Sequence, residues 1–321
     1  MPHDLALSLP FTPRRIVIGA NAHVDIAAAI RAARPEFEIR GAPFMEITAA
    51  DVAWADTYIG FKRPPAAPDM GTVRWVHSTG AGVDGWLGQG LDARILLTRS
   101  PESFGPMIAE WAVARVFAVQ QQLASLLDAQ RKQQWAPRDI ARVAGTHALL
   151  VGTGDIGTHI ASAFAALGMR VTGVSRSGRA SHPAFDSVHS IERLPDLVGN
   201  ADWIVLSVPD TPESRGIVSR AVLERCQGAV LLNAGRGSVV EESALPEALD
   251  RGWLRAAALD VFTTEPLPAS SPLWGHPKVL VSPHISGLTT IEGAAEGFLD
   301  CAASLERGVL PKWVVDRARG Y

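Results

Sequence analysis

An arginine, a glutamate and a histidine each follow an apolar segment in the last third of the chain. Arg236 lies in 231–237 (LLNAGRG), Glu265 in 259–266 (LDVFTTEP) and His284 in 282–287 (SPHISG). A guanidinium binds a carboxylate through its planar fork, and a carboxylate beside an imidazole orients the ring and favours its protonated form. Because open α/β sheets bind ligands where their strands end, the three side chains are candidates for a ligand-binding site. Taken singly, they could instead be a surface cation, a solvated carboxylate and a hydrogen-bonding residue at a helix start.

The elements that must position these residues alternate in type along the chain. Short apolar runs predict strands, and segments with helical spacing separate several of them. Strands are predicted at 15–19, 57–61, 73–78, 94–98, 147–151, 170–174, 203–207, 229–232, 256–259 and 279–281, and helices at 24–33, 106–134, 156–167 and 290–307. This rhythm predicts an α/β fold with parallel sheets, which bind ligands at the carboxyl ends of their strands.

A glycine-rich segment lies where the strand at 147–151 leads into a helix. Residues 149–157 read LLVGTGDIG, so that Gly152, Gly154 and Gly157 fit the pattern G-x-G-x-x-G. The first glycine permits a tight turn, the second lets a pyrophosphate approach the backbone, and the third allows close packing of helix and strand. The free N–H groups at the start of the helix, near Asp155 and Ile156, favour phosphate. The segment predicts dinucleotide binding; a purely structural glycine turn is the alternative.

The residues after the next strand bear on the choice of cofactor. A site for NAD usually has an acidic residue about 20 residues beyond the glycines, where it binds the ribose 2′-hydroxyl. This chain has Ser175, Arg176 and Ser177 there, followed by Arg179. A guanidinium can pair with a 2′-phosphate, and hydroxyl groups can donate to it. The sequence therefore favours NADP(H), with NAD(H) possible; alternatively, Arg176 is a solvated loop residue.

Composition excludes several other classes of protein. The chain has 321 residues, 47% of them hydrophobic, and 30 basic against 33 acidic residues, so its net charge is −3. This size predicts two or three domains, and a balanced charge argues against a nucleic-acid partner. Its two cysteines, Cys226 and Cys301, form no metal-ligand pattern, so no metal is expected. No apolar stretch is long enough for a membrane span, and the first residues lack a basic leader, so we expect a cytoplasmic protein without a membrane partner.

Seven segments together resemble the NAD(P)-dependent D-2-hydroxyacid dehydrogenase family. They are STGAGVD (78–84), AEW (109–111), GTGDIG (152–157), SVPDTP (207–212), NAGRGSVVEE (233–242), ALDVFTTEPL (258–267) and SPHISG (282–287). The resemblance covers nearly the whole chain and is most specific over about 145–290. Within the family the chain is most similar to the glyoxylate/hydroxypyruvate reductases, many of which prefer NADPH. It departs from the NAD-using members in lacking the acidic ribose-binding residue.

The resemblance also implies an architecture. We expect two Rossmann/flavodoxin-like parallel-sheet domains with a cleft between them. The substrate-binding domain would be discontinuous, with residues 1–105 plus 288–321, and the dinucleotide-binding Rossmann domain would be 106–287. Family members are commonly homodimers through the cofactor domain, so a homodimer is expected. Trp135, after the long helix, could then border the site of a partner subunit.

The same resemblance implies roles in catalysis and substrate binding. Arg236 would bind the carboxylate of a 2-keto acid and polarise its carbonyl group. The backbone N–H groups near Ala81 and Gly82 would bind the other carboxylate oxygen. His284, paired with Glu265, would protonate the carbonyl oxygen as hydride passes from nicotinamide C4 to substrate C2.

Four further residues would contact the cofactor. Val208 and Pro209 match the loop that borders it, Ala234 matches the segment that approaches the nicotinamide, and Asp260 matches a residue that faces the carboxamide. These contacts, like the catalytic roles, are expectations that the resemblance implies.

The predicted reaction is the NADPH-dependent reduction of glyoxylate or hydroxypyruvate to the D-2-hydroxy acid. One alternative is a bulkier 2-keto acid of the phenylpyruvate or 2-ketogluconate type, because the specificity loops (44–64 and 80–90) do not reveal pocket size. Another is a non-catalytic NAD(P)-sensing binding protein on the same fold.

Overall fold

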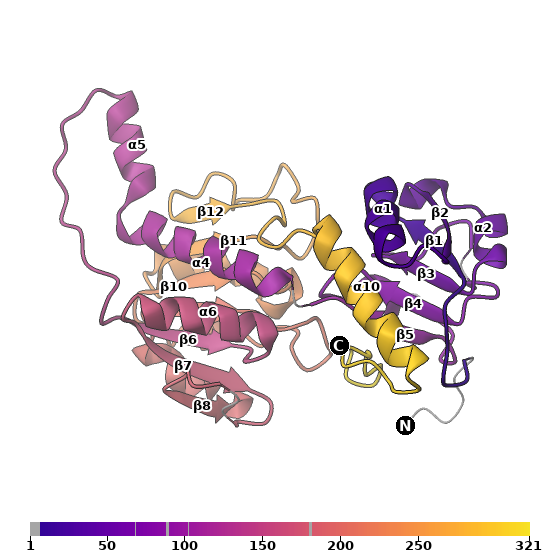
Figure 1. Ribbon diagram of the computed structural model, residues 1–321. Coiled ribbons are helices and arrows are strands. Elements are labelled where there is room, and N and C mark those ends of the chain that lie inside the picture. The colour runs from indigo at the N-terminus through magenta and orange to yellow at the C-terminus, as the bar shows by residue number, and fades with distance from the viewer. Residues whose placement is uncertain (1–6, 68, 88–89, 102, 180–181) are drawn as a thin grey trace. The chain divides into compact units, whose positions relative to one another are not determined.

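The protein is described by a computed structural model in which two compact units are present (Figure 1). The structure describes residues 7–67, 69–87, 90–101, 103–179 and 182–321. Residues 88 and 89 of the predicted specificity loop and the first six residues of the chain lie outside these ranges. One unit comprises Met1–Phe104 and Thr289–Tyr321, and the other comprises Gly105–Leu288. Each unit is built around its own parallel sheet, as the α/β rhythm of the sequence predicts.

The first unit contains a five-stranded sheet in the order β2-β1-β3-β4-β5, with all neighbours parallel. Its strands are β1 (Arg15–Gly19), β2 (Glu38–Ala42), β3 (Thr57–Gly60), β4 (Trp75–Ser78) and β5 (Leu96–Arg99). Its helices are α1 (His23–Ala33), α2 (Ala49–Trp54), α3 (Asp84–Leu87) and α10 (Ile291–Glu306). The four predicted strands are confirmed. Strand β2 was not predicted, because it is an edge strand in which only Ile39 is buried, so that its apolar signal is weak.

The core of this unit holds a buried polar group beside an aromatic stack. Trp75 on β4 stacks on Phe298 of α10 with ring centroids 4.9 Å apart. His77, two residues along, is fully buried, and its ring nitrogens lie 2.8 Å from the hydroxyls of Thr98 and Ser100. Burial lowers the pKa of His77 to about 3, so the ring is neutral at physiological pH. The two hydroxyls satisfy a side chain that would otherwise destabilise the core.

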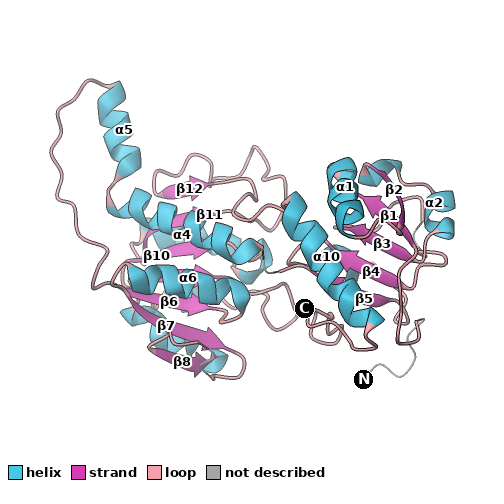
Figure 2. Ribbon diagram, in the orientation of Figure 1, coloured by secondary structure: helices cyan, strands magenta, loops and turns pink. Residues whose placement is uncertain are grey.

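The second unit contains a seven-stranded parallel sheet in the order β12-β11-β10-β9-β6-β7-β8. Its strands are β6 (His147–Val151), β7 (Arg170–Ser175), β8 (Ser187–Ser190), β9 (Trp203–Leu206), β10 (Ala229–Asn233), β11 (Leu254–Leu259) and β12 (Val279–Val281). The α-helices of this part of the chain are α4 (Phe104–Gln120), α5 (Leu123–Arg131), α6 (Asp155–Ala166), α7 (Leu194–Leu197), α8 (Arg220–Leu223) and α9 (Leu245–Asp250) (Figure 2). The six predicted strands of this unit are confirmed, and β8 at the sheet edge was missed.

The strand order of the larger sheet reverses at β6, where β7 continues on one side and β9 lies on the other. Open parallel sheets bind ligands at such a switch point. His147 at the start of β6 has partners for both ring nitrogens, the Asn200 carbonyl at 2.8 Å and the Thr172 hydroxyl at 2.9 Å. It is a structural histidine and lies at the opposite end of the strand from the glycine loop.

The prediction of one helix over 106–134 is wrong. Helix α4 ends at Gln120, Gln122 adopts a left-handed conformation with φ 52°, and α5 then runs in a different direction (Figure 1). The reason is a set of contacts with distant residues. The side chain of Gln120 donates to the Arg142 carbonyl at 3.1 Å, and that of Gln122 donates to the Asp139 carbonyl at 2.9 Å. These hydrogen bonds with the returning segment stabilise a break that local helix propensity does not reveal.

Candidate active site

The three predicted catalytic side chains lie beyond neighbouring strands of the seven-stranded sheet. Arg236 follows β10, Glu265 follows β11 and His284 follows β12, and these three strands are adjacent and parallel. Their carboxyl ends therefore meet at one edge of the sheet. The larger unit alone brings the loops of all three residues to that edge, although the residues are up to 48 positions apart in the sequence.

The histidine and the glutamate form a direct pair. His284 Nδ1 lies 2.8 Å from Glu265 Oε2, and the two side chains are 43% and 36% exposed. Because an ionised carboxylate only accepts hydrogen bonds, Nδ1 carries the proton of this contact and Nε2 remains for another partner. The other carboxylate oxygen, Oε1, accepts a hydrogen bond from the Phe262 N–H at 3.0 Å. The carboxylate is thus fixed on both sides and can orient the imidazole.

The loop that carries the histidine is held by a buried carboxylate. Asp260 is fully buried, and its Oδ1 accepts from the Ser282 hydroxyl at 2.6 Å and the Ile285 N–H at 3.0 Å. Its Oδ2 accepts from the Ser286 N–H at 2.7 Å, and its carbonyl accepts from the His284 N–H at 2.8 Å. These bonds stabilise His284 at φ +54°, a left-handed conformation that few residues other than glycine adopt.

Two residues in this arrangement were not predicted as site residues. The indole N–H of Trp111 on α4 donates to the Ser282 hydroxyl at 3.1 Å, which in turn donates to Asp260. The AEW segment that supports the family resemblance therefore has a physical function, because Trp111 holds the serine that holds Asp260. The predicted contact of Asp260 with a nicotinamide carboxamide remains a prediction, while its contacts with the histidine loop are observed.

The arginine loop packs directly on the loop of the glutamate. A Cβ atom at Gly237 would collide with the backbone of Phe262, so only glycine permits this approach. Asn233 donates to the Arg236 carbonyl at 2.9 Å and accepts from the Gly235 N–H at 3.1 Å, which fixes the turn. The guanidinium Nη1 donates to the Gly235 carbonyl at 2.8 Å. The loops of all three catalytic candidates are therefore coupled through backbone contacts and side-chain hydrogen bonds.

Two carboxylates support these loops and were missed from the sequence. Asp210 accepts from Arg215 Nε at 2.8 Å and from the Ser238 hydroxyl at 2.9 Å. The hydrogen bond from Arg215 lowers the pKa of Asp210, against the opposing effect of its partial burial, and the positive charge of Arg236 adds to the lowering. Glu242 accepts from the Thr263 N–H at 2.9 Å, next to the Phe262 N–H that binds Glu265. Asp210 lies 26 residues before Arg236 and Glu242 six residues after it, and neither spacing signals such a role.

The glycine loop has the geometry that a dinucleotide requires. Gly152 has φ +107°, and a Cβ atom on it would lie 2.8–3.1 Å from Ser207; one on Gly157 would collide with the Gly152 carbonyl. Gly154 is different, because a Cβ atom there would have nothing within 4 Å. It caps α6 without a side-chain hydrogen bond, so the helix presents its first N–H groups beside open space. Asp155 and Ile156, predicted as contacts, form the first turn of this helix.

The predicted ribose-phosphate residues lie at the same edge of the sheet. Strand β7, parallel to β6, ends at Ser175. The Ser175 hydroxyl accepts from the Gly178 N–H at 3.2 Å, and the Ser177 hydroxyl accepts from the Arg179 N–H at 3.4 Å, so both hydroxyls shape a tight turn. Arg176, between them, is exposed. The turn offers a cation and hydroxyl groups and no carboxylate, a set that fits NADP.

The three remaining cofactor candidates border the same strand ends. Gly235 packs so closely on Val208 that a Cβ atom would lie 2.8 Å from its carbonyl oxygen. Ala234 is therefore beside the loop of Val208 and Pro209, which follows β9 at the switch point. The structure brings these segments together, and their contact with a cofactor remains a prediction.

The predicted substrate loop belongs to the first unit and follows β4. Arg99 Nη1 donates to the Ala81 carbonyl at 2.7 Å, and the ring of Phe61 lies so close to Gly80 that a Cβ atom there would be 2.6 Å from it. These contacts fix the backbone. Among the residues that the structure describes, the N–H groups of Ala81 and Gly82 donate to no other group. Two unpaired N–H groups on one turn suit the oxygen of an anion.

Neither a metal centre nor a membrane segment is found in the described part of the chain. Its His, Cys, Asp and Glu residues form no group of three or more that could hold a metal ion. None of its helices has the length and apolar character that a bilayer requires. The side chains of Cys226 and Cys301 are both buried, and no disulfide joins them.

Comparison with known proteins identifies relatives over most of the chain. A family model described as "D-isomer specific 2-hydroxyacid dehydrogenase, NAD binding domain" matches residues 113–286. A glyoxylate/hydroxypyruvate reductase A from Serratia proteamaculans is 32% identical over 272 residues, which cover 81% of this chain and 86% of the relative.

Two solved structures are also similar throughout. A D-isomer specific 2-hydroxyacid dehydrogenase from Xanthobacter autotrophicus Py2, in complex with NADPH and MES, is 29% identical, with a TM-score of 0.87 and coverage of 97% and 100%. An NADPH-dependent glyoxylate/hydroxypyruvate reductase from Sinorhizobium meliloti, in complex with NADP and sulfate, is 27% identical, with a TM-score of 0.83 and coverage of 96% and 100%.

Proposed function

Since the chain belongs to the D-isomer specific 2-hydroxyacid dehydrogenase family and is an NAD(P)-dependent enzyme of it, we propose that it reduces small 2-keto acids with NADPH. Glyoxylate and hydroxypyruvate are the proposed substrates, because the Serratia and Sinorhizobium relatives bear the names of reductases for both. The observation that carries the proposal is the pair of His284 and Glu265, 2.8 Å apart, on loops that pack against that of Arg236.

Different residues of the larger unit carry out different parts of the proposed reaction. NADPH, when bound, supplies the hydride that reaches substrate C2. His284 donates a proton from Nε2 to the carbonyl oxygen, because Nδ1 is engaged with Glu265. Glu265 orients the ring and stabilises the imidazolium from which the proton leaves. The opposite direction uses the same atoms, with Nε2 as the base.

The carboxylate of the substrate requires its own donors. We assign this role to the guanidinium of Arg236, whose planar fork matches a carboxylate, and to the N–H groups of Ala81 and Gly82. Arg236 also polarises the carbonyl group next to that carboxylate, so that negative charge on the oxygen is stabilised as it develops.

The cofactor assignment rests on the glycine loop and on the turn at 175–179. We propose that the first N–H groups of α6 bind the pyrophosphate and that Arg176 binds the 2′-phosphate, with the hydroxyls of Ser175 and Ser177 beside it. The Xanthobacter neighbour contains NADPH and the Sinorhizobium neighbour contains NADP, which supports the preference for the phosphorylated cofactor.

Replacement of Arg176 by alanine tests this preference. A hydrogen bond to a charged group contributes about 1.5–3 kcal/mol, so the KM for NADPH should rise about 10- to 100-fold. The KM for NADH should change little, because NADH has no phosphate at this position. Steady-state kinetics with each cofactor at saturating 2-keto acid measure both values.

The matched control is Arg193→Ala, which removes an exposed arginine of the same unit whose Nε lies 3.1 Å from Asp196. Its KM values should equal those of the wild type. Equal increases for NADPH and NADH in the Arg176 variant would contradict a phosphate-specific role.

We also propose that the chain forms a homodimer through the segment around α5. This helix and the loop after it extend away from the sheet of their unit (Figure 1). They expose apolar side chains that a partner would cover: Leu123, Leu127, Trp135 and Ile140, of which Trp135 is 96% exposed. The mass of the purified protein in solution tests this assembly.

The decisive experiment for the function is a substrate panel. Purified enzyme is incubated with NADPH or NADH and with glyoxylate or hydroxypyruvate, and the absorbance at 340 nm is followed. We expect oxidation that depends on the 2-keto acid and is faster with NADPH. If the protein binds NADPH but none of the 2-keto acids causes NADPH to be oxidised, the protein is a cofactor sensor and the proposed enzyme function is rejected.

A further inference from the structure

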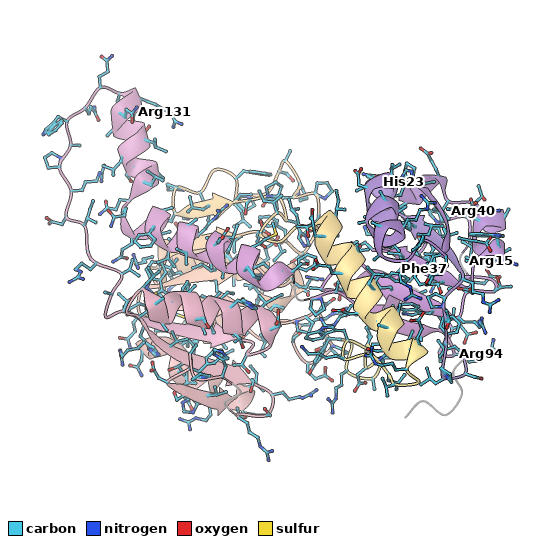
Figure 3. All side chains as sticks on the ribbon, viewed as in Figure 1. Arg15, His23, Phe37, Arg40, Arg94 and Arg131 are labelled. Carbon is cyan, nitrogen blue, oxygen red and sulfur yellow. The ribbon has the colours of Figure 1, made fainter. Side chains whose placement is uncertain are left out.

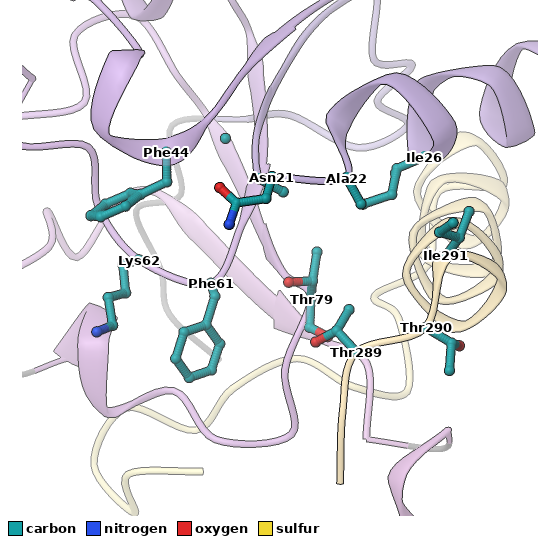
Figure 4. Close-up of a pocket in the computed structure, with 12 residues that line it drawn as sticks. Asn21, Ala22, Ile26, Phe44, Phe61, Lys62, Thr79, Thr289, Thr290 and Ile291 are labelled. Carbon is teal, nitrogen blue, oxygen red and sulfur yellow. The ribbon is translucent and has the colours of Figure 1, made fainter. Parts of the chain in front are cut away.

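A pocket of about 380 Å³ lies in the five-stranded unit, at the carboxyl ends of its strands (Figure 4). Its lining includes residues 19–22 at the end of β1, 61–62 after β3, Thr79 after β4 and residues 289–291 at the start of α10. The strand order of this smaller sheet reverses between β1 and β3. The pocket therefore occupies the switch point of the unit, the place where open parallel sheets bind ligands.

The pocket adjoins the loop to which the substrate carboxylate is assigned. Thr79 lines the pocket and stands two residues before Ala81. The ring of Phe61, also in the wall, packs on Gly80, and the hydroxyl of Thr289 donates to the Thr79 carbonyl at 3.2 Å. A molecule held by the N–H groups of Ala81 and Gly82 thus has this pocket next to it, within the same unit.

The walls are mostly apolar, and several of their polar groups are already engaged. The apolar lining consists of Ala20, Ala22, Ile26, Phe44, Phe61 and Ile291. Of the lining hydroxyls, that of Thr289 donates to Thr79 and that of Thr290 accepts from the Gly293 N–H at 2.9 Å. The other polar side chains of the lining are those of Thr79 and of the exposed Asn21 and Lys62, and no acidic side chain belongs to the lining. Such a surface suits an apolar group better than a chain of hydroxyl groups, each of which would need a partner.

We propose that this pocket binds the C3 substituent of the 2-keto acid and that the enzyme accepts substrates in which this substituent is apolar, an aryl or branched alkyl group. The inference rests on the proposed function and specifies the substrate class of the same site. Glyoxylate has no C3 and carries only a hydrogen on C2, so it would leave this pocket empty. Pockets of 300 Å³ or more are typical of sites that bind larger ligands. Phe44, which follows β2, and Phe61, which follows β3, provide the aromatic surface for such a group (Figure 4).

The first test uses the wild-type enzyme and a series of substrates. Pyruvate, 2-ketobutyrate, 2-ketovalerate and phenylpyruvate are compared with hydroxypyruvate at saturating NADPH. Burial of one CH₂ group strengthens binding about fourfold, so kcat/KM should rise about fourfold for each carbon added to the substrate. For phenylpyruvate it should at least equal the value for hydroxypyruvate.

The outcomes separate this inference from the proposed function. If hydroxypyruvate is reduced and kcat/KM falls along the series, the pocket inference is overturned and the proposed function stands. If no 2-keto acid is reduced, the proposed function itself is rejected, and the inference with it.

The second test fills the pocket. Ala22 lines it and precedes α1 without making a side-chain cap, so Ala22→Leu adds volume at a position where no hydrogen bond is lost. The ratio of kcat/KM for phenylpyruvate to that for hydroxypyruvate should fall at least tenfold. Ala32→Leu, an exposed alanine on the same helix, is the matched control and should leave this ratio unchanged. An unchanged ratio in the Ala22 variant would overturn the inference.

Discussion

Replacement of His284 by alanine is expected to lower kcat about 1000-fold, because a positioned general acid contributes about 10²- to 10⁴-fold to such a step. The dissociation constant of NADPH should stay close to that of the wild type, since no predicted cofactor contact includes the imidazole. Steady-state oxidation of NADPH at saturating 2-keto acid measures the first quantity, and fluorescence titration with the cofactor measures the second. The two readings together distinguish loss of the proton donor from loss of the fold.

Two further variants sharpen this prediction. Glu265→Gln keeps an oxygen that can accept from Nδ1 but removes the charge that stabilises the imidazolium, so its kcat should lie between those of the wild type and the alanine variant. His189→Ala removes a half-buried histidine on β8 in the same unit and should leave kcat unchanged. Near-normal turnover by His284→Ala would show that another group protonates the carbonyl oxygen.

The glycine loop shows what a sequence can predict about a site. Gly152, Gly154 and Gly157 were assigned a turn, an open approach and a close packing, and the structure has a positive φ, empty space and a backbone contact at these positions. Each requirement depends on residues within a few positions along the chain, and glycine meets it for a steric reason. Local geometry of this kind is visible in the sequence.

The support of the histidine loop shows what a sequence does not reveal. Trp111, Asp260 and Ser282 form a chain of hydrogen bonds across 171 positions of sequence, and no spacing rule connects them. Each residue also has an ordinary explanation, as a core aromatic, a loop carboxylate or a strand-end serine. Together they hold His284 in a left-handed conformation. The sequence does not reveal this effect, because it depends on the pairing of β11 with β12 in the folded sheet.

The break after α4 illustrates the same limit for secondary structure. Residues 106–134 contain no internal glycine or proline, so local propensity favours one long helix. The energy that opposes it comes from residues 139 and 142, whose carbonyls accept from Gln122 and Gln120. Strands β2 and β8 were missed for a related reason. Both are edge strands, and their partial exposure leaves no continuous apolar run.

The Arg236→Lys variant separates the shape of the cation from its charge. Both side chains are positive, but an ammonium cannot form the two parallel hydrogen bonds of a guanidinium with a carboxylate. The lysine side chain would also lose the bond from Nη1 to the Gly235 carbonyl that now holds the group in place. Loss of one hydrogen bond to a charged group costs about 1.5–3 kcal/mol, so kcat/KM for the 2-keto acid should fall about 100-fold.

The distribution of that loss identifies the step that Arg236 serves. If the guanidinium only binds the carboxylate, KM rises and kcat is preserved; if it also polarises the carbonyl, kcat falls as well, and we expect both changes. Arg225→Lys is the matched control, since Arg225 lies on the surface of the same unit, 3.5 Å from Asp196, and its kinetics should equal those of the wild type. A kcat/KM for Arg236→Lys within about threefold of the wild-type value would show that other groups bind the carboxylate. The loop of Arg236 packs on the loop of Glu265, the partner of His284, and this packing is the reason for placing the substrate next to His284. If Arg236 does not bind the carboxylate, that reason is lost.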